Sequence, residues 1–240
     1  AETSGQVTAS LAAFARIGVS IGGKFVGVEK RVTIVDTKLL DLGSKCLGNP
    51  AAPPTTLQLA ALGAGGLLTL NMGPFAVRRG YTPPTDPRNE EFTVSHIAGL
   101  PTDPGGETVD VTAFGFTQRY TGVQAISADG ADGNDSITIE RGVLSPATLK
   151  GGSQDDLLRY LGSGSAMLEG GPDNDILEGG NGPNTLSRDA GKDKLIGGAG
   201  PNMLFGGGDD DELRGGTGAN FLDGESGNDL VIGGTGPNDM

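Results

Sequence analysis

The sequence predicts an all-β protein whose second half is a parallel β-solenoid, with two nine-residue units in each coil of 18 residues. Units such as GGAGPNMLF (197–205) and GGGDDDELR (206–214) recur without a slip from Leu161 to the end. The chain of 240 residues contains 44 Gly and no Trp, and only 5 % of its residues are aromatic. Stacked coils suit this composition, because each coil buries small aliphatic side chains against the next one.

Residues 1–118 precede the repeats, and we expect this region to be β-rich. Apolar and polar residues alternate in KRVTIVD (30–36), EFTVS (91–95) and ETVDVTAFGF (107–116), which is typical of strands. The apolar segment 57–71 favours either a short helix or buried strands. We therefore predict that this region forms either a separate β-domain or irregular rungs that continue the solenoid.

The repeats occupy residues 119–240 and carry most of the negative charge. The formal net charge is −13; residues 1–118 hold 10 acidic and 9 basic residues, whereas residues 119–240 hold 20 and 8. An acidic surface argues against a nucleic-acid partner, because phosphate binding needs a basic face. It favours either a cation or simple solubility. No apolar run is long enough for a transmembrane helix, and Cys46 is the only cysteine, so no internal disulfide is possible.

The positions within one unit have separate roles. Glycine mostly fills positions one, two and four, where the tight turn needs backbone angles that glycine adopts without steric cost. Position eight is nearly always aliphatic, and stacking places these side chains in one continuous column. Burial of each leucine is worth roughly 1.5–3 kcal/mol. The predicted core column is Leu168, Leu177, Leu186, Leu195, Leu204, Leu213, Leu222, Val231 and Met240.

Position six alternates between a carboxylate and an amide from one unit to the next. Successive units face opposite edges of a flattened coil, so each residue type is predicted to stack on its own edge. The Asp edge contains Asp135, Asp156, Asp175, Asp193, Asp211 and Asp229, and the Asn edge contains Asn184, Asn202, Asn220 and Asn238. Ala147 and Ala166 occupy the Asn edge in the earlier coils.

A column of aspartates requires a cation. Carboxylates in coils about 4.8 Å apart repel one another by about 3 kcal/mol at an effective dielectric constant near 20. Turn preference alone explains Asp in a turn, but not why one edge is all Asp and the other all Asn. Carboxylates with glycine carbonyls in a flexible geometry suit Ca²⁺, and the single His96 and single Cys46 exclude a Cys/His zinc site. We expect several calcium ions on the Asp edge only.

The Asn edge is predicted to bind no metal. Amide groups both donate and accept hydrogen bonds, so stacked Asn side chains are able to form a ladder along this edge. Pro183, Pro201 and Pro237 precede three of these residues and stiffen the turn.

Units such as GGPDNDILE (170–178) and GESGNDLVI (224–232) resemble the RTX, or haemolysin-type calcium-binding, nonapeptide GGxGxDxUx. The resemblance covers roughly residues 128–240. It implies a right-handed parallel β-roll in a secreted or cell-surface bacterial protein that folds on meeting extracellular calcium. It also implies that the six aspartates are ligands, with carbonyl groups near Gly170, Gly206 and Gly224. Two departures are the Asn edge and the residues Arg188 and Asp189, which replace two leading glycines.

Several functions are compatible with these repeats, because a fold does not fix a function. We expect a structural or adhesive extracellular protein without enzymatic activity: a segment of a giant surface protein, or a subunit of a filament of copies stacked head to tail. The repeat stops at Met240 without a polar cap, so we expect either a cut chain or stacking by another copy. The start at Ala1 favours a processed chain or a fragment.

The main alternative is a calcium-dependent folding and export module of a secreted enzyme whose catalytic part is absent from this chain. Neither HExxH nor GxSxG occurs in residues 1–118, and Glu90–Glu91 is interpreted as a solvated pair. Ice binding is less favoured, because position three on the Asn edge is Asn181, Ala199, Thr217 and Thr235 rather than a row of threonines.

Overall fold

The computed structural model describes residues 18–21, 24–27, 57–79 and 89–240. The chain divides into two compact units, residues 1–54 and 55–240. In the first unit, β1 (Gly18–Ile21) and β2 (Lys24–Gly27) form an antiparallel hairpin. The predicted strand at 30–36 lies outside the described residues.

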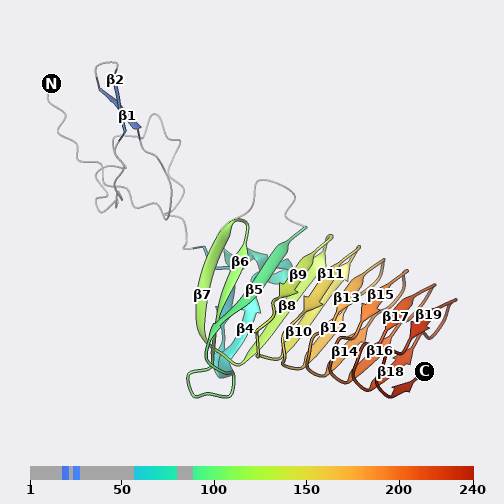
Figure 1. The fold of residues 1–240 in the computed structure, drawn as a ribbon. Helices are drawn as coiled ribbons and strands as arrows, with labels where there is room; N and C mark the ends of the chain where they lie inside the picture. The colour runs from blue at the N-terminus through green and yellow to red at the C-terminus, as the bar shows by residue number, and fades with distance from the viewer. Residues whose placement is uncertain (1–17, 22–23, 28–56, 80–88) are drawn as a thin grey trace. The chain divides into compact units, whose positions relative to one another are not determined.

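Residues 57–79 and 89–240 form a solenoid with two nine-stranded sheets, shown as stacked rungs in Figure 1. Strands of the repeats pair in parallel with the strand two places away in sequence, so each coil contributes one strand to each sheet. Sheet I consists of β3 (Ala60–Leu62), β4 (Leu67–Leu70), β8 (Ala125–Asp132), β10 (Ala147–Ser153), β12 (Ala166–Glu169), β14 (Asn184–Ser187), β16 (Asn202–Phe205), β18 (Asn220–Asp223) and β20 (Asn238–Asp239). Sheet II consists of β5 (Glu91–Ala98), β6 (Glu107–Ala113), β7 (Phe116–Val123), β9 (Ser136–Ile139), β11 (Leu157–Tyr160), β13 (Ile176–Glu178), β15 (Lys194–Ile196), β17 (Glu212–Arg214) and β19 (Leu230–Ile232). The predicted all-β solenoid is confirmed.

The first rung of the solenoid comes from residues before the repeats. Strand β4 pairs in parallel with β8, and β5 pairs in parallel with β9. Antiparallel strands then continue both sheets, with β3 next to β4 and the β6–β7 hairpin next to β5. Segment 57–71 therefore forms strands β3 and β4, joined by the short 3-10 helix η2 (Ala64–Gly66). A second 3-10 helix, η3 (Gly73–Arg79), follows β4.

The expected boundary at 118/119 falls inside β7, which belongs to the same sheet as the repeats. The prediction of one strand over 107–116 was wrong at its end. Phe114 and Gly115 have φ values of 52° and 77°, and they turn the chain back into β7. The alternating pattern does not reveal this turn, because Phe is a strand-favouring residue.

The core is a column of aliphatic side chains between the two sheets. The position-eight leucines from Leu168 to Leu222 are all buried, whereas Val231 is half-buried and Met240 is exposed. Coils toward the N-terminal end are longer: Ile126 pairs with Ala147, Ala147 with Ala166 and Asn184 with Asn202, which gives coils of 21, 19 and 18 residues. The extra residue Tyr160 is fully buried and fills part of this wider section.

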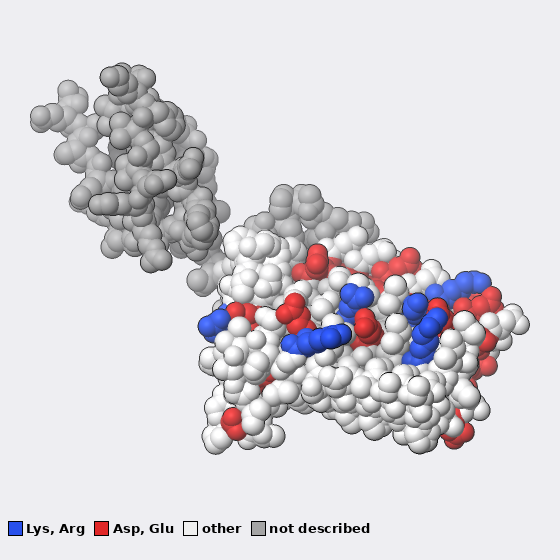
Figure 2. Space-filling model, viewed as in Figure 1, with Lys and Arg blue, Asp and Glu red and all other residues white. Residues whose placement is uncertain are grey.

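The outer surface of the rungs carries pairs of opposite charge. Salt bridges join Lys150 to Glu169, Arg159 to Glu178 and Lys194 to Glu212, each between neighbouring rungs. Figure 2 shows basic and acidic side chains next to one another over this surface. Exposed pairs of this kind contribute about 0–1 kcal/mol each. The 8 basic residues of 119–240 are also too few to pair with its 20 acidic residues, so surface salt bridges do not account for all of the acidic side chains.

Candidate metal centre

The six aspartates of the Asp edge lie at equivalent corners of successive coils, each directly before a strand of sheet II. Asp135 precedes β9, and Asp229 precedes β19. Five of them are 1–3 % exposed, and Asp229 is half-buried. A buried carboxylate is costly unless it is paired or hydrogen-bonded, so the partners of each oxygen atom decide what this edge binds.

One oxygen of each carboxylate accepts a hydrogen bond from the protein backbone. The backbone N–H of each aspartate donates a hydrogen bond to Oδ1 of the aspartate in the next coil. The distances are 2.7 Å for Asp135 to Asp156, 2.8 Å for Asp156 to Asp175, 2.6 Å for Asp175 to Asp193, 2.9 Å for Asp193 to Asp211 and 3.0 Å for Asp211 to Asp229. These bonds fix the carboxylates in a row.

The other oxygen has no hydrogen-bond partner. The Oδ2 atoms of Asp135, Asp156, Asp175, Asp193 and Asp211 are all buried and make no hydrogen bond. In four of these units the Oδ2 atom faces the first glycine of its own turn, namely Gly130, Gly151, Gly170 and Gly206. An ideal Cβ built on Gly206 would lie 2.7 Å from both Asp211 Oδ2 and the carbonyl oxygen of Gly224. Carboxylate and carbonyl oxygens thus converge from neighbouring coils, without a donor between them.

The surroundings of these aspartates disfavour their negatively charged form. Burial raises the pKa of Asp135 to about 7 and that of Asp156 to about 8. Burial also raises the pKa of Asp175 and of Asp211 to about 6, although Arg188 lowers both. Neighbouring acidic groups contribute to the increase in all four. The charged form is therefore disfavoured in the metal-free roll, and a bound cation would reverse this preference.

These residues fit a hard cation with oxygen ligands. Among the described residues, no three Asp, Glu, His or Cys side chains converge on one point. A cation on this edge would therefore combine carboxylates of single coils with backbone carbonyls, a ligand set suited to Ca²⁺. Gly206 and Gly224 lie at such a corner, whereas the carbonyl oxygen of Gly170 already accepts a hydrogen bond of 2.9 Å from Gly152 N.

On the Asn edge, the side-chain amides find hydrogen-bond partners within the protein. Asn184 Nδ2 donates to Gly182 O at 2.8 Å, Gly197 O at 2.9 Å and Asn202 Oδ1 at 2.7 Å. Asn202 repeats this pattern toward Asn220, and Asn220 toward Asn238. The four residues form a continuous amide ladder.

The two edges present different side-chain atoms at the corner next to the first glycine of the unit. An ideal Cβ built on Gly179 would lie 2.5 Å from Gly197 O and 2.8 Å from Asn184 Nδ2. The equivalent position on Gly206 faces Gly224 O and Asp211 Oδ2. An N–H donor thus fills the site on the Asn edge, whereas an oxygen faces other oxygens on the Asp edge. The Asp edge therefore offers negative charge and unpartnered oxygen atoms to a cation, and the Asn edge offers neither at this corner.

The Asp column extends one rung further than the sequence indicated. Glu90 is 2 % exposed, its backbone N–H donates to Asp135 Oδ1 at 2.7 Å, and its Oε2 accepts from Gly73 N at 2.5 Å. The interpretation of Glu90–Glu91 as a solvated pair was wrong for Glu90, because the pairing of β5 with β9 places it inside the coil. A protein donor, rather than a cation, thus satisfies Oε2 at this end.

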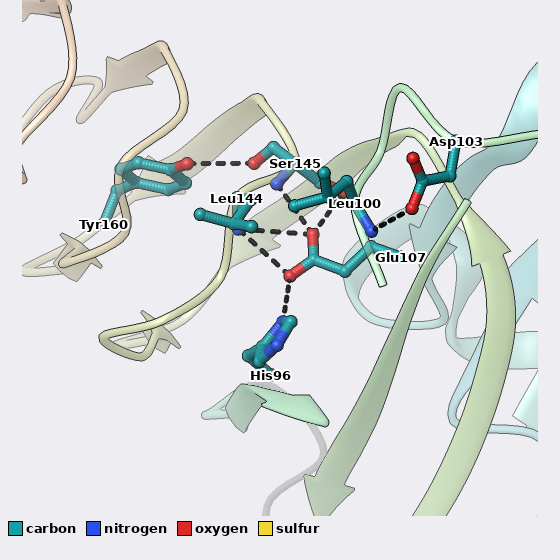
Figure 3. A network of polar contacts seen from close by, with 7 residues as sticks. All are labelled: His96, Leu100, Asp103, Glu107, Leu144, Ser145 and Tyr160. Carbon is teal, nitrogen blue, oxygen red and sulfur yellow. Dashed lines mark hydrogen bonds and ion pairs between the residues drawn. The ribbon is translucent and has the colours of Figure 1, made fainter. Parts of the chain in front are cut away.

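A second buried carboxylate, Glu107, joins the β6–β7 hairpin to the first coil of the repeats (Figure 3). It accepts hydrogen bonds from Ser145 N at 2.7 Å, Ser145 Oγ at 2.6 Å and His96 Nδ1 at 2.6 Å. Leu144 N also donates to it at 3.0 Å. Glu107 lies between Ser145 and His96, and Ser145 is fully buried. This network therefore joins two parts of the fold rather than activating the serine as a nucleophile.

An apolar groove lies apart from the Asp column. It lies over sheet I and is lined by apolar side chains that include Met167, Met203 and Phe221, together with the prolines before the Asn ladder. Its lining is chemically unlike the Asp column, so we place the candidate metal centre at the Asp edge. No helix within the described residues has the length and apolarity needed to cross a membrane.

Comparison with known families agrees with this geometry. Residues 169–204, 187–219 and 205–240 match the model of the RTX calcium-binding nonapeptide repeat (4 copies). Searches of curated proteins and of solved structures found no match to the chain. Residues 169–240 therefore consist of RTX calcium-binding nonapeptide repeats, a type of repeat typical of secreted bacterial proteins.

Proposed function

We propose that this chain, in which residues 169–240 are RTX calcium-binding repeats, is a calcium-stabilised structural or adhesive module of an extracellular or cell-surface protein. The observation that carries the proposal is the row of five buried Oδ2 atoms without a hydrogen-bond partner. Calcium binds along the Asp edge only, because the amide ladder already fills the corresponding places on the Asn edge.

The role assigned to calcium is structural. Each ion neutralises carboxylates whose pKa is raised by burial and joins one coil to the next. A ligand that binds only the folded state adds a stabilisation of RT ln(1 + [L]/Kd). Extracellular calcium modules have dissociation constants of about 10⁻⁴–10⁻³ M. The roll is therefore expected to be stable at millimolar calcium outside the cell and unstable at the low calcium concentration inside it.

The experiment is a calcium titration of the 240-residue chain that starts in excess chelator. Circular dichroism is expected to report a gain of β-structure at roughly 0.1–1 mM calcium, and magnesium at the same concentration is the control. Magnesium demands a smaller, more regular shell of ligands and is expected to have little effect. A chain that is fully folded and equally stable with and without chelator would contradict the proposal.

Within this function, the chain assembles with other copies of itself. Among the described residues, β3 and β7 are the edge strands at one end of the two sheets, and β20 and β19 at the other. Edge strands present unpaired backbone groups, and the contact of unlike ends generates filaments. Electron microscopy and sedimentation at millimolar calcium test this point. Particles of monomeric mass at every protein concentration would argue against stacking.

The alternative is that the roll assists folding and export of an enzyme to which this chain belongs. The described residues favour the structural role, because the only buried Ser–Glu–His cluster has its glutamate in the middle. The catalytic part of that enzyme would lie outside this chain, so the test fuses the chain to a reporter enzyme and measures folding and export of the fusion with and without calcium. Export of the reporter enzyme that requires the fused chain and calcium would favour this alternative.

A further inference from the structure

One residue breaks the pattern of the Asp edge. The unit at residues 188–196 begins with Arg188, where the other units of this edge have glycine. Its side chain is fully buried, although arginine is rarely buried without a partner. Other basic side chains that form salt bridges between neighbouring coils, such as Lys192 and Lys194, are exposed. An arginine placed inside therefore requires an explanation.

The guanidinium group of Arg188 lies within the Asp column. Its Nη1 forms an ion pair with Asp193 Oδ1. Burial lowers the pKa of Arg188 to about 10, and the negative charges of Asp211 in the next coil and Asp175 in the preceding coil oppose this decrease. The cation thus lies among the aspartates of three successive coils.

The backbone makes room for this side chain. At Gly206, the atom of the next coil nearest to an ideal Cβ is a carbonyl oxygen, but at Gly170 it is Arg188 Cδ, at 2.6 Å. A side chain at residue 170 would displace Arg188. The arginine therefore passes over Gly170 toward the carboxylates, in the place where the next coil offers a carbonyl oxygen elsewhere on this edge.

From these contacts we propose that Arg188 is a built-in cation, which replaces bound calcium between the coils of Asp175, Asp193 and Asp211. This inference rests on the proposed calcium binding along the Asp edge. Calcium then binds in two separate groups, one at Asp135 and Asp156 and the other at Asp211 and Asp229. The middle of the roll keeps its order without metal, because the guanidinium supplies positive charge at every calcium concentration.

The first test restores the glycine of the repeat. The number of calcium ions per chain is measured by isothermal titration calorimetry and equilibrium dialysis for the full chain and for Arg188→Gly. We expect the variant to bind at least one more ion than the original chain. Lys192→Gln is the matched control, because it removes a positive charge from the same unit at an exposed position; its stoichiometry is expected to stay unchanged. An equal number of ions in Arg188→Gly and the original chain would overturn the inference.

The second test needs no calcium. Hydrogen exchange in excess chelator is expected to show the strongest protection in β13, β14 and β15, the strands around Arg188, and weaker protection toward β19. Arg188→Gln keeps most of the volume but removes the charge, and is expected to lose this local protection. Protection that is the same in Arg188→Gln and in Lys192→Gln would also overturn the inference.

The two proposals fail in different ways. If neither the original chain nor Arg188→Gly binds calcium, the proposed function is wrong, while the exchange experiment still decides whether Arg188 acts as an internal cation. If both bind calcium in equal number, the function stands and the inference is wrong.

Discussion

The backbone amide of Asp156 donates a hydrogen bond of 2.8 Å to Oδ1 of Asp175, which leaves Oδ2 of Asp175 buried without a hydrogen-bond partner. The same hydrogen bond from a backbone N–H to Oδ1 joins each aspartate of the column to the next. It holds the carboxylates in register while keeping one oxygen available. The Asp column thus forms the candidate site, and it also leaves buried carboxylate oxygens without hydrogen-bond partners in the metal-free roll.

The stability of the metal-free roll is expected to depend on pH in an unusual direction. The pKa is raised to about 7 in Asp135, about 8 in Asp156 and about 6 in Asp175 and Asp211. A group with a raised pKa in the folded state stabilises folding below its unfolded pKa and loses this contribution as pH rises through the folded value. In chelator, urea denaturation should therefore give a higher midpoint at pH 5 than at pH 8.5. With saturating calcium this difference should shrink or reverse, because protons compete with the ion.

Asp156→Asn is expected to make the roll less dependent on calcium. The amide nitrogen replaces the unpartnered Oδ2 and is able to donate to nearby carbonyls, as Asn184 does on the opposite edge. Removal of an unsatisfied buried acceptor should stabilise the chain in chelator by about 1–3 kcal/mol, while the calcium stoichiometry falls. Thermal unfolding in chelator and calorimetry measure the two effects. Asp155→Asn is the control, because Asp155 is exposed and its bond to Asn174 N is retained; an equal effect in both variants would contradict the prediction.

The reverse exchange, Asn202→Asp, should create a calcium-dependent coil. Asn202 Nδ2 donates to Gly200 O, Gly215 O and Asn220 Oδ1, and an oxygen in its place would face three acceptors. In chelator we expect a loss of about 3 kcal/mol, with recovery when calcium is added. Chemical denaturation with and without calcium measures both values. Asn181→Asp changes the charge equally on the same edge but at an exposed position, and should have little effect.

The aliphatic column should respond strongly to truncation. Leu177 is fully buried, whereas its neighbour Ile176 in the same strand is 42 % exposed. Leu177→Ala should lower the free energy of unfolding by about 2–5 kcal/mol, and Ile176→Ala by much less. Calcium-saturated chains are compared by urea denaturation. Similar losses in the two variants would show that the column is not the core.

The repeats could be predicted from the sequence because each position has one role. The spacing of Asp175, Asp193 and Asp211 placed these residues on one edge, and the structure stacks them there. The spacing also separated the amides from the carboxylates. The assignment of these aspartates as calcium ligands stays a prediction.

Other parts of the site could not be predicted, because their partners are distant in sequence. Glu90 joins the Asp column through the pairing of β5 with β9, 45 residues away, and it does not belong to a nonapeptide. The contact of Glu107 with Ser145 likewise depends on how the β6–β7 hairpin meets the first coil. The sequence shows Arg188 where the other units of this edge have glycine. Its burial among the aspartates could not be predicted, because it depends on residues from three coils.

The parallel rungs also determine how the roll would respond to a pulling force. Strands lie side by side along the stack, as in Figure 1, so backbone hydrogen bonds between coils run along its length. Tension on the C-terminal end would peel away one coil of 18 residues at a time, releasing about 60 Å of chain at each step. Bound calcium would raise the rupture force of every coil it joins to the next. The coils next to Arg188 would break at a force that is independent of calcium. Under tension, the calcium concentration would therefore set the rupture force of the other coils but not that of these.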